Sequence, residues 1–231
     1  MIEVKKLTKA YNNTVVLNIP ELKIEKGESF GLVGNNGAGK TTFFRIILDL
    51  IHSNTGEVSS QGEDVKTTTN WKTYTGSFLD EGFLIDFLTP EEYFDFIGGV
   101  NNLSKGDIKS FLDQFSDFFN GEILDKKKYI RDLSRGNKQK VGIAAALISN
   151  PDVLVLDEPF ASLDPTTQIR LKNLLKQLKT DKNVTMLISS HDLNHVTEVC
   201  ERIVVLKDGN ITHDIKTSSD TLKELESYFA V

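Results

Sequence analysis

A glycine-rich segment constrains the fold of this 231-residue chain more than any other feature of its sequence. Residues 34–41 read Gly-Asn-Asn-Gly-Ala-Gly-Lys-Thr and match the pattern G-x-x-x-x-G-K-[ST] at every fixed position. Ser29 to Val33, just before it, have the apolar content of a short buried strand, and a buried helix is expected from Lys40 onward. A strand, a glycine loop and a helix in this order predict a loop that binds phosphate.

The residue types in this loop indicate how it would hold a nucleotide. Glycines let successive backbone N–H groups turn toward an anion, and the following helix adds the positive end of its dipole. Lys40 supplies a mobile cation for the β- and γ-phosphates, and the Thr41 hydroxyl is suited to ligate Mg²⁺. The predicted contacts of the nucleotide in this segment are Gly34, Asn35, Asn36, Gly37, Ala38, Gly39, Lys40, Thr41 and Thr42.

Two adjacent carboxylates follow another apolar run. Val153 to Leu156 has the pattern of a strand buried on both faces, and Asp157 and Glu158 come directly after it. The carboxyl ends of parallel strands lie at the ligand-binding edge of a sheet. One carboxylate can therefore hold Mg²⁺, and the other can orient and deprotonate an attacking water. A solvated acidic turn is the alternative for such a pair alone, and the phosphate-binding loop in the same chain favours the catalytic interpretation.

The order of apolar segments predicts an α/β fold of the P-loop NTPase type. Buried strands alternate with helices through the last third of the chain, which indicates a mostly parallel central sheet. The predicted strands there span 153–156, 184–188 and 203–206, and the predicted helices span 134–149, 165–179 and 192–200. The first third reads as strands with turns and is the expected antiparallel β subdomain. Pro20 is expected to break its second β-rich stretch, Val15 to Ile24.

The middle of the chain differs from both ends. Residues 82–133 are rich in Phe, Asp and Lys, and two helix starts are expected there. Thr89-Pro90-Glu91-Glu92 carries a capping threonine, an early proline and a glutamate three residues after the cap, and Ser104 resembles a second cap. We therefore interpret 1–231 as one domain. In it, 1–81 and 134–231 form the nucleotide-binding core with its β subdomain, and 82–133 form an inserted helical subdomain.

Composition excludes several classes of protein. The formal charge of −6 and the pI near 5.3 do not suit a general nucleic-acid binder. The single cysteine, Cys200, cannot form an intramolecular disulfide, and this suits a reducing compartment. Neither a signal peptide nor a membrane-spanning stretch is apparent, so a cytoplasmic protein is expected. Any work at a membrane would then need a partner.

Residues 133–139, Leu-Ser-Arg-Gly-Asn-Lys-Gln, narrow the interpretation further. They lie upstream of the acidic pair and resemble the LSxGxxQ signature of ABC-type ATPases. Other parts of that family's pattern are present in order. Tyr11 resembles the aromatic that stacks on adenine, residues 162–164 resemble the segment that communicates across the dimer, and His191 resembles the histidine that contacts the γ-phosphate. The resemblance covers essentially the whole chain.

The resemblance implies separate roles for the polar residues at the site. Asp157 would ligate Mg²⁺ together with Thr41, and Glu158 would be the catalytic base. His191 and Lys40 would be the other catalytic residues, with ATP as the nucleotide.

One position departs from the family's pattern. The family has a Gln, sometimes a Glu, that links the metal and the attacking water to the helical subdomain. Asp80 stands at that place in this chain, with Glu81 as the alternative. Aspartate is shorter and cannot donate as an amide does, so the contact is expected to run through water or to be weaker.

The resemblance also implies a dimer, either of two copies or with a second ATPase subunit. Ser134 and Gly136, at a helix N-terminus, would cap the γ-phosphate held by Lys40 of the other subunit. Two chains would then form two equivalent ATP sites, which close on binding and open after hydrolysis.

The function implied by the resemblance is to power a membrane transporter. The expected partner is an integral-membrane subunit docked on residues 82–133, which would hold the chain at the inner face of the cell membrane. The form of the signature and the short segment after His191 resemble small bacterial exporter ATPases, so export is expected. One alternative is a soluble ABC ATPase acting on a ribosome or a nucleic-acid complex. Another is a small-molecule kinase, which would leave the signature and His191 without a role.

Overall fold

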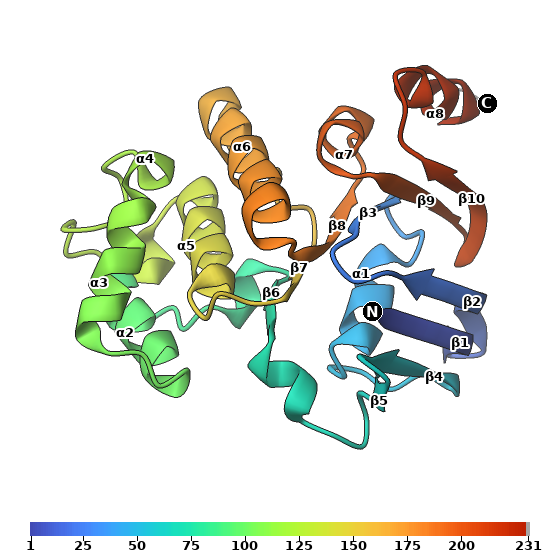
Figure 1. Cartoon of the computed structure of the whole chain (residues 1–231), viewed down its shortest axis with the longest axis horizontal. Coiled ribbons are helices and arrows are strands. Elements are labelled where there is room, and N and C mark those ends of the chain that lie inside the picture. The colour runs from blue at the N-terminus through green and yellow to red at the C-terminus, as the bar shows by residue number, and fades with distance from the viewer. Residues whose placement is uncertain (230–231) are drawn as a thin grey trace.

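The computed structural model describes residues 1–229, which fold into two sheets with helices packed on them (Figure 1). One sheet has four antiparallel strands in the order β2-β1-β4-β5. The other has six strands in the order β10-β9-β3-β8-β7-β6, and all of its pairs are parallel except β9 with β10. The predicted α/β fold with a mostly parallel central sheet and an antiparallel β region is confirmed.

The bounds of the elements follow the chain from one end to the other. The strands are β1 (Ile2–Tyr11), β2 (Thr14–Ile24), β3 (Ser29–Val33), β4 (Thr55–Ser60), β5 (Glu63–Asp64), β6 (Thr75–Phe78), β7 (Val153–Leu156), β8 (Thr185–Ser190), β9 (Arg202–Lys207) and β10 (Asn210–Lys216). The α-helices are α1 (Lys40–Ile47), α2 (Pro90–Val100), α3 (Lys105–Gln114), α4 (Ser116–Phe119), α5 (Arg135–Leu147), α6 (Pro165–Lys182), α7 (Leu193–Val199) and α8 (Thr221–Phe229). Short 3-10 turns are η1 (Asn70–Thr73), η2 (Glu81–Phe83) and η3 (Ile130–Asp132).

The second β-rich stretch corrects one expectation. Strand β2 runs through Pro20 without a break. Proline cannot donate a ladder hydrogen bond, and it is tolerated where a strand lies at the edge of a sheet. Strand β2 occupies such an edge in the order β2-β1-β4-β5, so the expected break was wrong.

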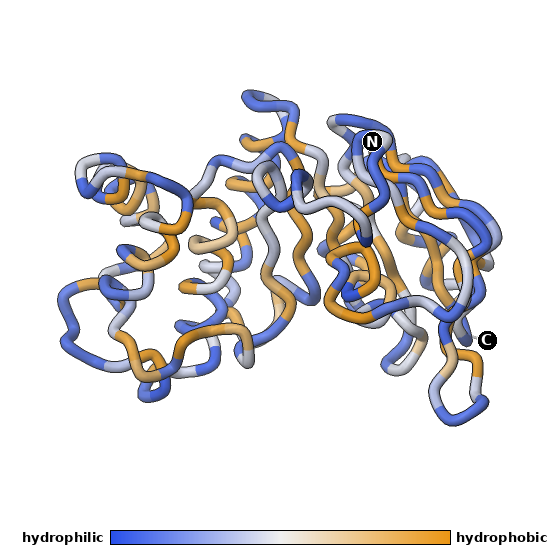
Figure 2. The backbone as a smooth tube through the Cα atoms, turned by 90° about the horizontal axis from the view of Figure 1, so that it is seen from below, coloured by the Kyte–Doolittle hydropathy of each residue, from blue (hydrophilic) through white to orange (hydrophobic). Residues whose placement is uncertain are grey.

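Alternate residues of the central strands feed two separate cores. Leu154 and Leu156 of β7 belong to the cluster that also contains the buried residues of α5, α6 and α7. Val153 and Val155 belong to the cluster of α1 and the four-stranded sheet. Successive side chains of a strand point to opposite faces, so the six-stranded sheet is covered on both faces. Figure 2 shows the apolar residues concentrated along these central strands.

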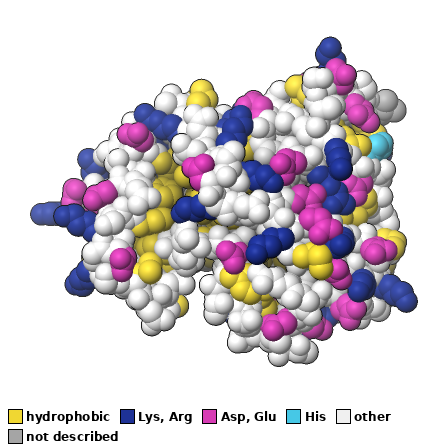
Figure 3. All heavy atoms as spheres, in the orientation of Figure 1, with side chains coloured by type: hydrophobic (Ala, Val, Ile, Leu, Met, Phe, Trp, Pro, Cys, Tyr) yellow, Lys and Arg dark blue, Asp and Glu magenta, His cyan; other side chains and the backbone are white. Residues whose placement is uncertain are grey.

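Residues 82–133, which we call the helical insert, carry α2, α3 and α4. Both helix starts expected there are present: Thr89 and Ser104 each form a capping box. The buried aromatic residues of the insert share one cluster with α5 and the central sheet, so apolar packing continues across residue 133. In Figure 3, yellow side chains line a hollow between the insert and α6, where α3, α5 and α6 enclose a cavity of about 400 Å³. Within residues 1–229, no helix is long and apolar enough to span a membrane.

Candidate nucleotide site

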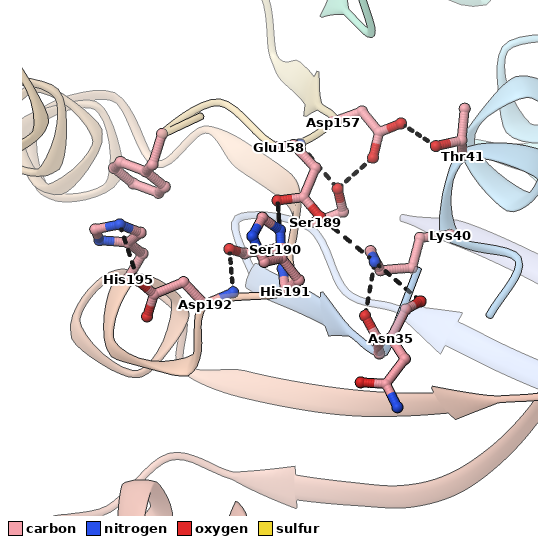
Figure 4. Close-up of polar contacts among 12 residues, drawn as sticks. Asn35, Lys40, Thr41, Asp157, Glu158, Ser189, Ser190, His191, Asp192 and His195 are labelled. Carbon is pink, nitrogen blue, oxygen red and sulfur yellow. Dashed lines mark hydrogen bonds and ion pairs between the residues drawn. The ribbon is translucent and has the colours of Figure 1, made fainter. Parts of the chain in front are cut away.

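Three neighbouring parallel strands bring the candidate residues to one edge of the central sheet. Strand β8 pairs with β3 on one side and with β7 on the other. The phosphate-binding loop follows β3, the acidic pair follows β7, and His191 follows β8. The carboxyl ends of parallel strands face the same way, so these three segments, far apart in the sequence, lie together (Figure 4).

The phosphate-binding loop has the backbone that its glycines make possible. Gly37 and Gly39 have φ angles of 84° and 109°, in the left-handed region. A Cβ atom on Gly39 would lie 2.8 Å from the carbonyl oxygen of Val16, which packs against the loop from β2. Larger residues at position 39 would therefore meet both backbone strain and a steric clash.

Lys40 lies inside this loop, and its side chain is only 7% exposed. Its ammonium donates to the carbonyl oxygen of Gly34 at 2.7 Å and lies 3.5 Å from that of Asn35. It also lies 3.4 Å from Oε1 of Glu158 (Figure 4). The cation of the phosphate-binding loop and the second carboxylate of the acidic pair are thus in contact.

Asp157 is buried behind the loop. Its carboxylate accepts hydrogen bonds from the hydroxyls of Thr41 and Ser189. Burial raises the pKa of Asp157, and the two hydroxyl donors oppose that effect. A hydroxyl and a carboxylate side by side are the oxygen ligands that Mg²⁺ prefers, so Thr41 and Asp157 fit the metal of a nucleotide complex.

Glu158 has a left-handed backbone, with φ of 48°, and this turns its side chain away from that of Asp157. Its Oε2 lies 2.8 Å from Nδ1 of His191 and accepts from the backbone N–H of the same residue at 3.3 Å. The Glu158 N–H donates to the Ser189 hydroxyl at 2.9 Å, and its carbonyl oxygen accepts from the Gln139 amide at 3.2 Å. The two carboxylates of the pair therefore face different partners.

The remaining predicted nucleotide contacts are Tyr11 of β1 and Thr42 of α1. Tyr11 is the last residue of β1 and is 45% exposed, with the Lys9 ammonium 4.9 Å from the centre of its ring. The ring is thus partly open to solvent, with the Lys9 ammonium over it. Thr42 is partly buried in the first turn of α1, directly after Thr41.

The signature segment forms a second site around the N-terminus of α5. Ser134 caps this helix, and its hydroxyl accepts from the N–H of Asn137 at 3.2 Å. A Cβ atom on Gly136 would lie 2.6 Å from the carbonyl oxygen of Ser162. The described residues that line the adjoining cavity of about 390 Å³ include Ser134, Gly136, Ser162 and Asp164, but not Lys40 or the acidic pair.

The two acidic residues after β6 bind different parts of the molecule. Asp80 lies 3.3 Å from the Arg45 guanidinium of α1, and it accepts from the N–H of Gly82 at 2.8 Å. Glu81 lies 3.5 Å from Arg135 and 3.4 Å from Lys138, both on the signature helix. Asp80 and Glu81 line one cavity together with the acidic pair, although their closest charged partners are basic side chains.

Two residues at the site were not singled out from the sequence. Ser189 is fully buried and contacts both Asp157 and Glu158, and Gln139 connects the signature helix to Glu158. A buried hydroxyl at the end of an apolar strand was the available signal for Ser189. Gln139 was visible only as the last letter of the signature.

The chain is similar in sequence to known ATP-binding proteins. A family model described as "ABC transporter" matches residues 17–161. The bacitracin transport ATP-binding protein of Enterococcus faecalis is 32% identical over 220 residues, which are 94% of this chain and 70% of that protein. The methionine import ATP-binding protein of Carboxydothermus hydrogenoformans is 32% identical over 216 residues, which are 91% and 62% of the two chains.

A solved structure is also similar over most of the chain. It is a dimeric ATP-binding cassette in a post-hydrolysis state, bound to ADP and Pi. It superposes with a TM-score of 0.84 at 26% identity, over 95% of this chain and 100% of that one. Among the relatives compared, the chain spans between 61% and 82% of the relative's length.

Proposed function

This chain belongs to the ABC transporter family of ATPases, and we propose that it is the ATP-hydrolysing subunit that powers a membrane transporter. The observation that carries the proposal is the contact among Lys40, Glu158 and His191 at the end of three parallel strands. These are the groups that phosphoryl transfer to water needs: a cation for the phosphates and a base for the nucleophile.

Glu158 is the catalytic base in this proposal. Lys40 exchanges the Glu158 carboxylate for the β- and γ-phosphates when ATP binds, because phosphate carries the higher negative charge. The released carboxylate then orients and deprotonates the attacking water, while His191 holds its Oε2 from the other side. The contact between Lys40 and Glu158 is thus one that ATP replaces.

Mg²⁺ is the proposed metal, held by Thr41 and Asp157, with Asp80 as a further ligand through water. When bound, it neutralises part of the negative charge that develops on the phosphates. Asp157 binds the metal as a carboxylate whose position is already fixed by Ser189. The nucleotide is held along the loop from Gly34 to Thr42, with Tyr11 stacked on its base.

A dimer completes the ATP site in this proposal. Ser134 and Gly136 of one chain cap the γ-phosphate that Lys40 of the other chain holds, and two-fold symmetry makes both sites equivalent when the chains are identical. Support comes from the separate cavity at the N-terminus of α5 and from the dimeric cassette of similar structure. The second chain is a copy of this one or another ATPase subunit.

The helical insert, residues 82–133, is the proposed subdomain that docks on an integral-membrane partner and so holds the chain at the cytoplasmic face of a membrane. Half of its ten aromatic residues are buried, but Phe83, Phe87, Phe96 and Tyr129 are 49%, 63%, 49% and 45% exposed. Large exposed apolar side chains of this kind are suited to a protein interface.

Export is the direction we propose, on the form of the signature. The printed names of relatives include both bacitracin transport and methionine import, so these names do not distinguish the two directions. Both names belong to transport proteins, and the acidic charge of this chain also disfavours action on a ribosome or on nucleic acid.

Substitution of Glu158 by glutamine tests the function directly. The variant should bind ATP as the parent does, lose roughly 1,000-fold in kcat, and accumulate as an ATP-bound dimer, because only the base is removed. Steady-state ATPase assays, nucleotide titration and size-exclusion chromatography with ATP give the three readings. Glu21→Gln, the same change at an exposed glutamate of β2, is the matched control and should keep parental kcat. Parental hydrolysis by Glu158→Gln would remove Glu158 from the mechanism.

A further inference from the structure

His195 lies near Glu158 and His191, which we call the catalytic pair, and the function proposed above gives it no role. It sits in the first turn of α7, and its side chain is 12% exposed. Its ring stacks on Phe160 with centroids 4.4 Å apart and an angle of 26° between the planes. Phe160 is 3% exposed and is part of the core cluster around α5 and α6.

The ring of His195 joins the two segments that carry the catalytic pair. Its Nε2 lies 3.5 Å from Oδ2 of Asp192, the N-cap of α7 and the neighbour of His191 (Figure 4). Phe160 is anchored in the tight turn that begins at Glu158, where the N–H of Ala161 donates to the Glu158 carbonyl at 3.1 Å. A movement of His195 would therefore displace the segment of Glu158 and the segment of His191, and so change the contact between these two residues.

The surroundings of His195 favour the neutral ring. Nδ1 is buried and has no hydrogen-bond partner among the described residues. A neutral ring with its proton on Nε2 leaves an acceptor at that place, whereas a protonated ring would bury an N–H donor without an acceptor, which is more costly.

Charged groups of both signs face the ring. They are Asp192 and Glu198 of α7, Lys172 of α6 and Glu158 after β7. Burial is the largest influence and lowers the pKa of His195, Lys172 acts in the same direction, and the three carboxylates oppose them.

We propose that neutral His195 is a positioning residue that fixes Glu158 relative to His191, and that its protonation loosens this arrangement and slows ATP hydrolysis. The proposal rests on the function proposed above. The contacts of His195 among the described residues are with Phe160 and Asp192, so it acts through these two residues. The expected effect is on kcat and not on the affinity for ATP.

The direction of the pH dependence follows from linkage. The pKa of His195 is lower in the folded chain than in the unfolded one, so the folded chain binds this proton less tightly. Neutral His195 therefore contributes to the free energy of unfolding above the ordinary histidine pKa of about 6.5, and this contribution is lost as the pH falls below that value. The ATPase rate of the parent should therefore fall on the acid side in the same window.

Two variants of the full chain separate the ring's shape from its proton. His195→Phe keeps an aromatic face for Phe160, loses the contact with Asp192 and cannot be protonated, so its kcat should fall less than that of His195→Ala at pH 8 and should depend less on pH below about 6.5 than that of the parent. His195→Ala removes the stack, so its kcat should fall about tenfold at every pH, with KM for ATP within about twofold. The measurements are kcat and KM between about pH 5.5 and 8.5, with Mg²⁺-ATP as substrate.

The outcomes are distinguishable from a failure of the proposed function. If the parent itself does not hydrolyse ATP, the function is wrong. If the parent is active and His195→Phe follows the same pH profile as the parent, the proton of His195 does not control the rate, and this inference is wrong. Parental kcat in His195→Ala would also overturn it. The melting temperature of each variant checks that it is folded, and His195→Phe still tests the proton if His195→Ala does not fold.

Discussion

Two helix N-termini of this molecule are suited to bind phosphate, and they have very different surroundings. The N-terminus of α1 lies among groups from three strand ends, and Lys40 there contacts Glu158. The N-terminus of α5, capped by Ser134, opens on a cavity whose described lining includes Lys140, Glu122 and Asp164. Both offer backbone N–H groups and a hydroxyl, and both adjoin the acidic pair, but only the first carries a lysine that contacts a carboxylate of that pair.

This difference fits the proposed dimer, in which two chains supply different groups to one ATP site. Lys140, at the second site, is 2% exposed and its ammonium lies 2.8 Å from Glu122, and Arg135 there lies 3.5 Å from Glu81, so both cations of this site are already paired. The second site therefore presents a hydroxyl and helix N–H groups, which can cap a phosphate but cannot activate water. A nucleotide held by the first site of one chain and the second site of another would find both sets of groups.

Among the variants that test this comparison, Lys40→Ala is expected to have the largest effect, on the affinity for ATP. Removing the buried cation of the first site should weaken ATP binding about 100-fold, since a charge-assisted contact to phosphate is lost. Isothermal titration with ATP measures this change. Lys176→Ala, at an exposed lysine on α6, is the control and should bind ATP as the parent does. Unchanged affinity in Lys40→Ala would contradict the assignment of the phosphate-binding loop.

A smaller effect is expected from Gly136→Ala at the second site. The new Cβ would meet the Ser162 carbonyl at 2.6 Å and displace the signature from a γ-phosphate, so kcat should fall roughly 30-fold while single-chain affinity for ATP is unchanged. Gly99→Ala, at a helical glycine of the insert where a Cβ meets nothing within 4 Å, is the matched control.

A mixture of Lys40→Ala and Gly136→Ala chains tests directly whether the two helix N-termini meet across a dimer. One site of a mixed dimer combines both defects, whereas the other has an intact Lys40 and an intact Gly136. An equimolar mixture should therefore form ATP-dependent dimers that neither variant forms alone, as measured by light scattering. If the mixture shows no more ATP-dependent dimer by light scattering than the two variants measured separately, the two helix N-termini do not meet across chains.

The smallest effect is expected from Tyr11→Ala, which leaves both helix N-termini intact. Loss of one stacked base should raise KM for ATP about tenfold with little change in kcat. Tyr11→Phe keeps the stacking face and should restore the parental KM. Equal KM values in all three chains would place the base elsewhere.

Local signals predicted the elements well. The strands at 29–33 and 153–156 have the predicted bounds, and the helix starts at Thr89 and Ser104 are capped as expected. Such features depend on residues a few positions apart, whose hydrogen bonds and periodicity are visible in the sequence.

Contacts between distant segments were less predictable. Ile169 of α6 is 58% exposed, and Phe83, Phe87 and Phe96 are exposed although other aromatic residues of the insert are buried. Asp80 lies beside Arg45, 35 positions earlier in the chain. Nothing near residue 80 in the sequence indicates which basic side chain will lie beside it, because the packing of α1 decides that.

The sequence by itself determined that this chain carries a phosphate-binding loop, an acidic pair after a buried strand and a second glycine segment at a helix start. Each is a local pattern of backbone freedom and side-chain type. Only the tertiary structure decided that β8 lies between β3 and β7, so that Lys40, Glu158 and His191 touch while Ser134 lines a separate cavity. Strand order depends on how whole faces of the sheet are covered, and that information is distributed over the entire chain.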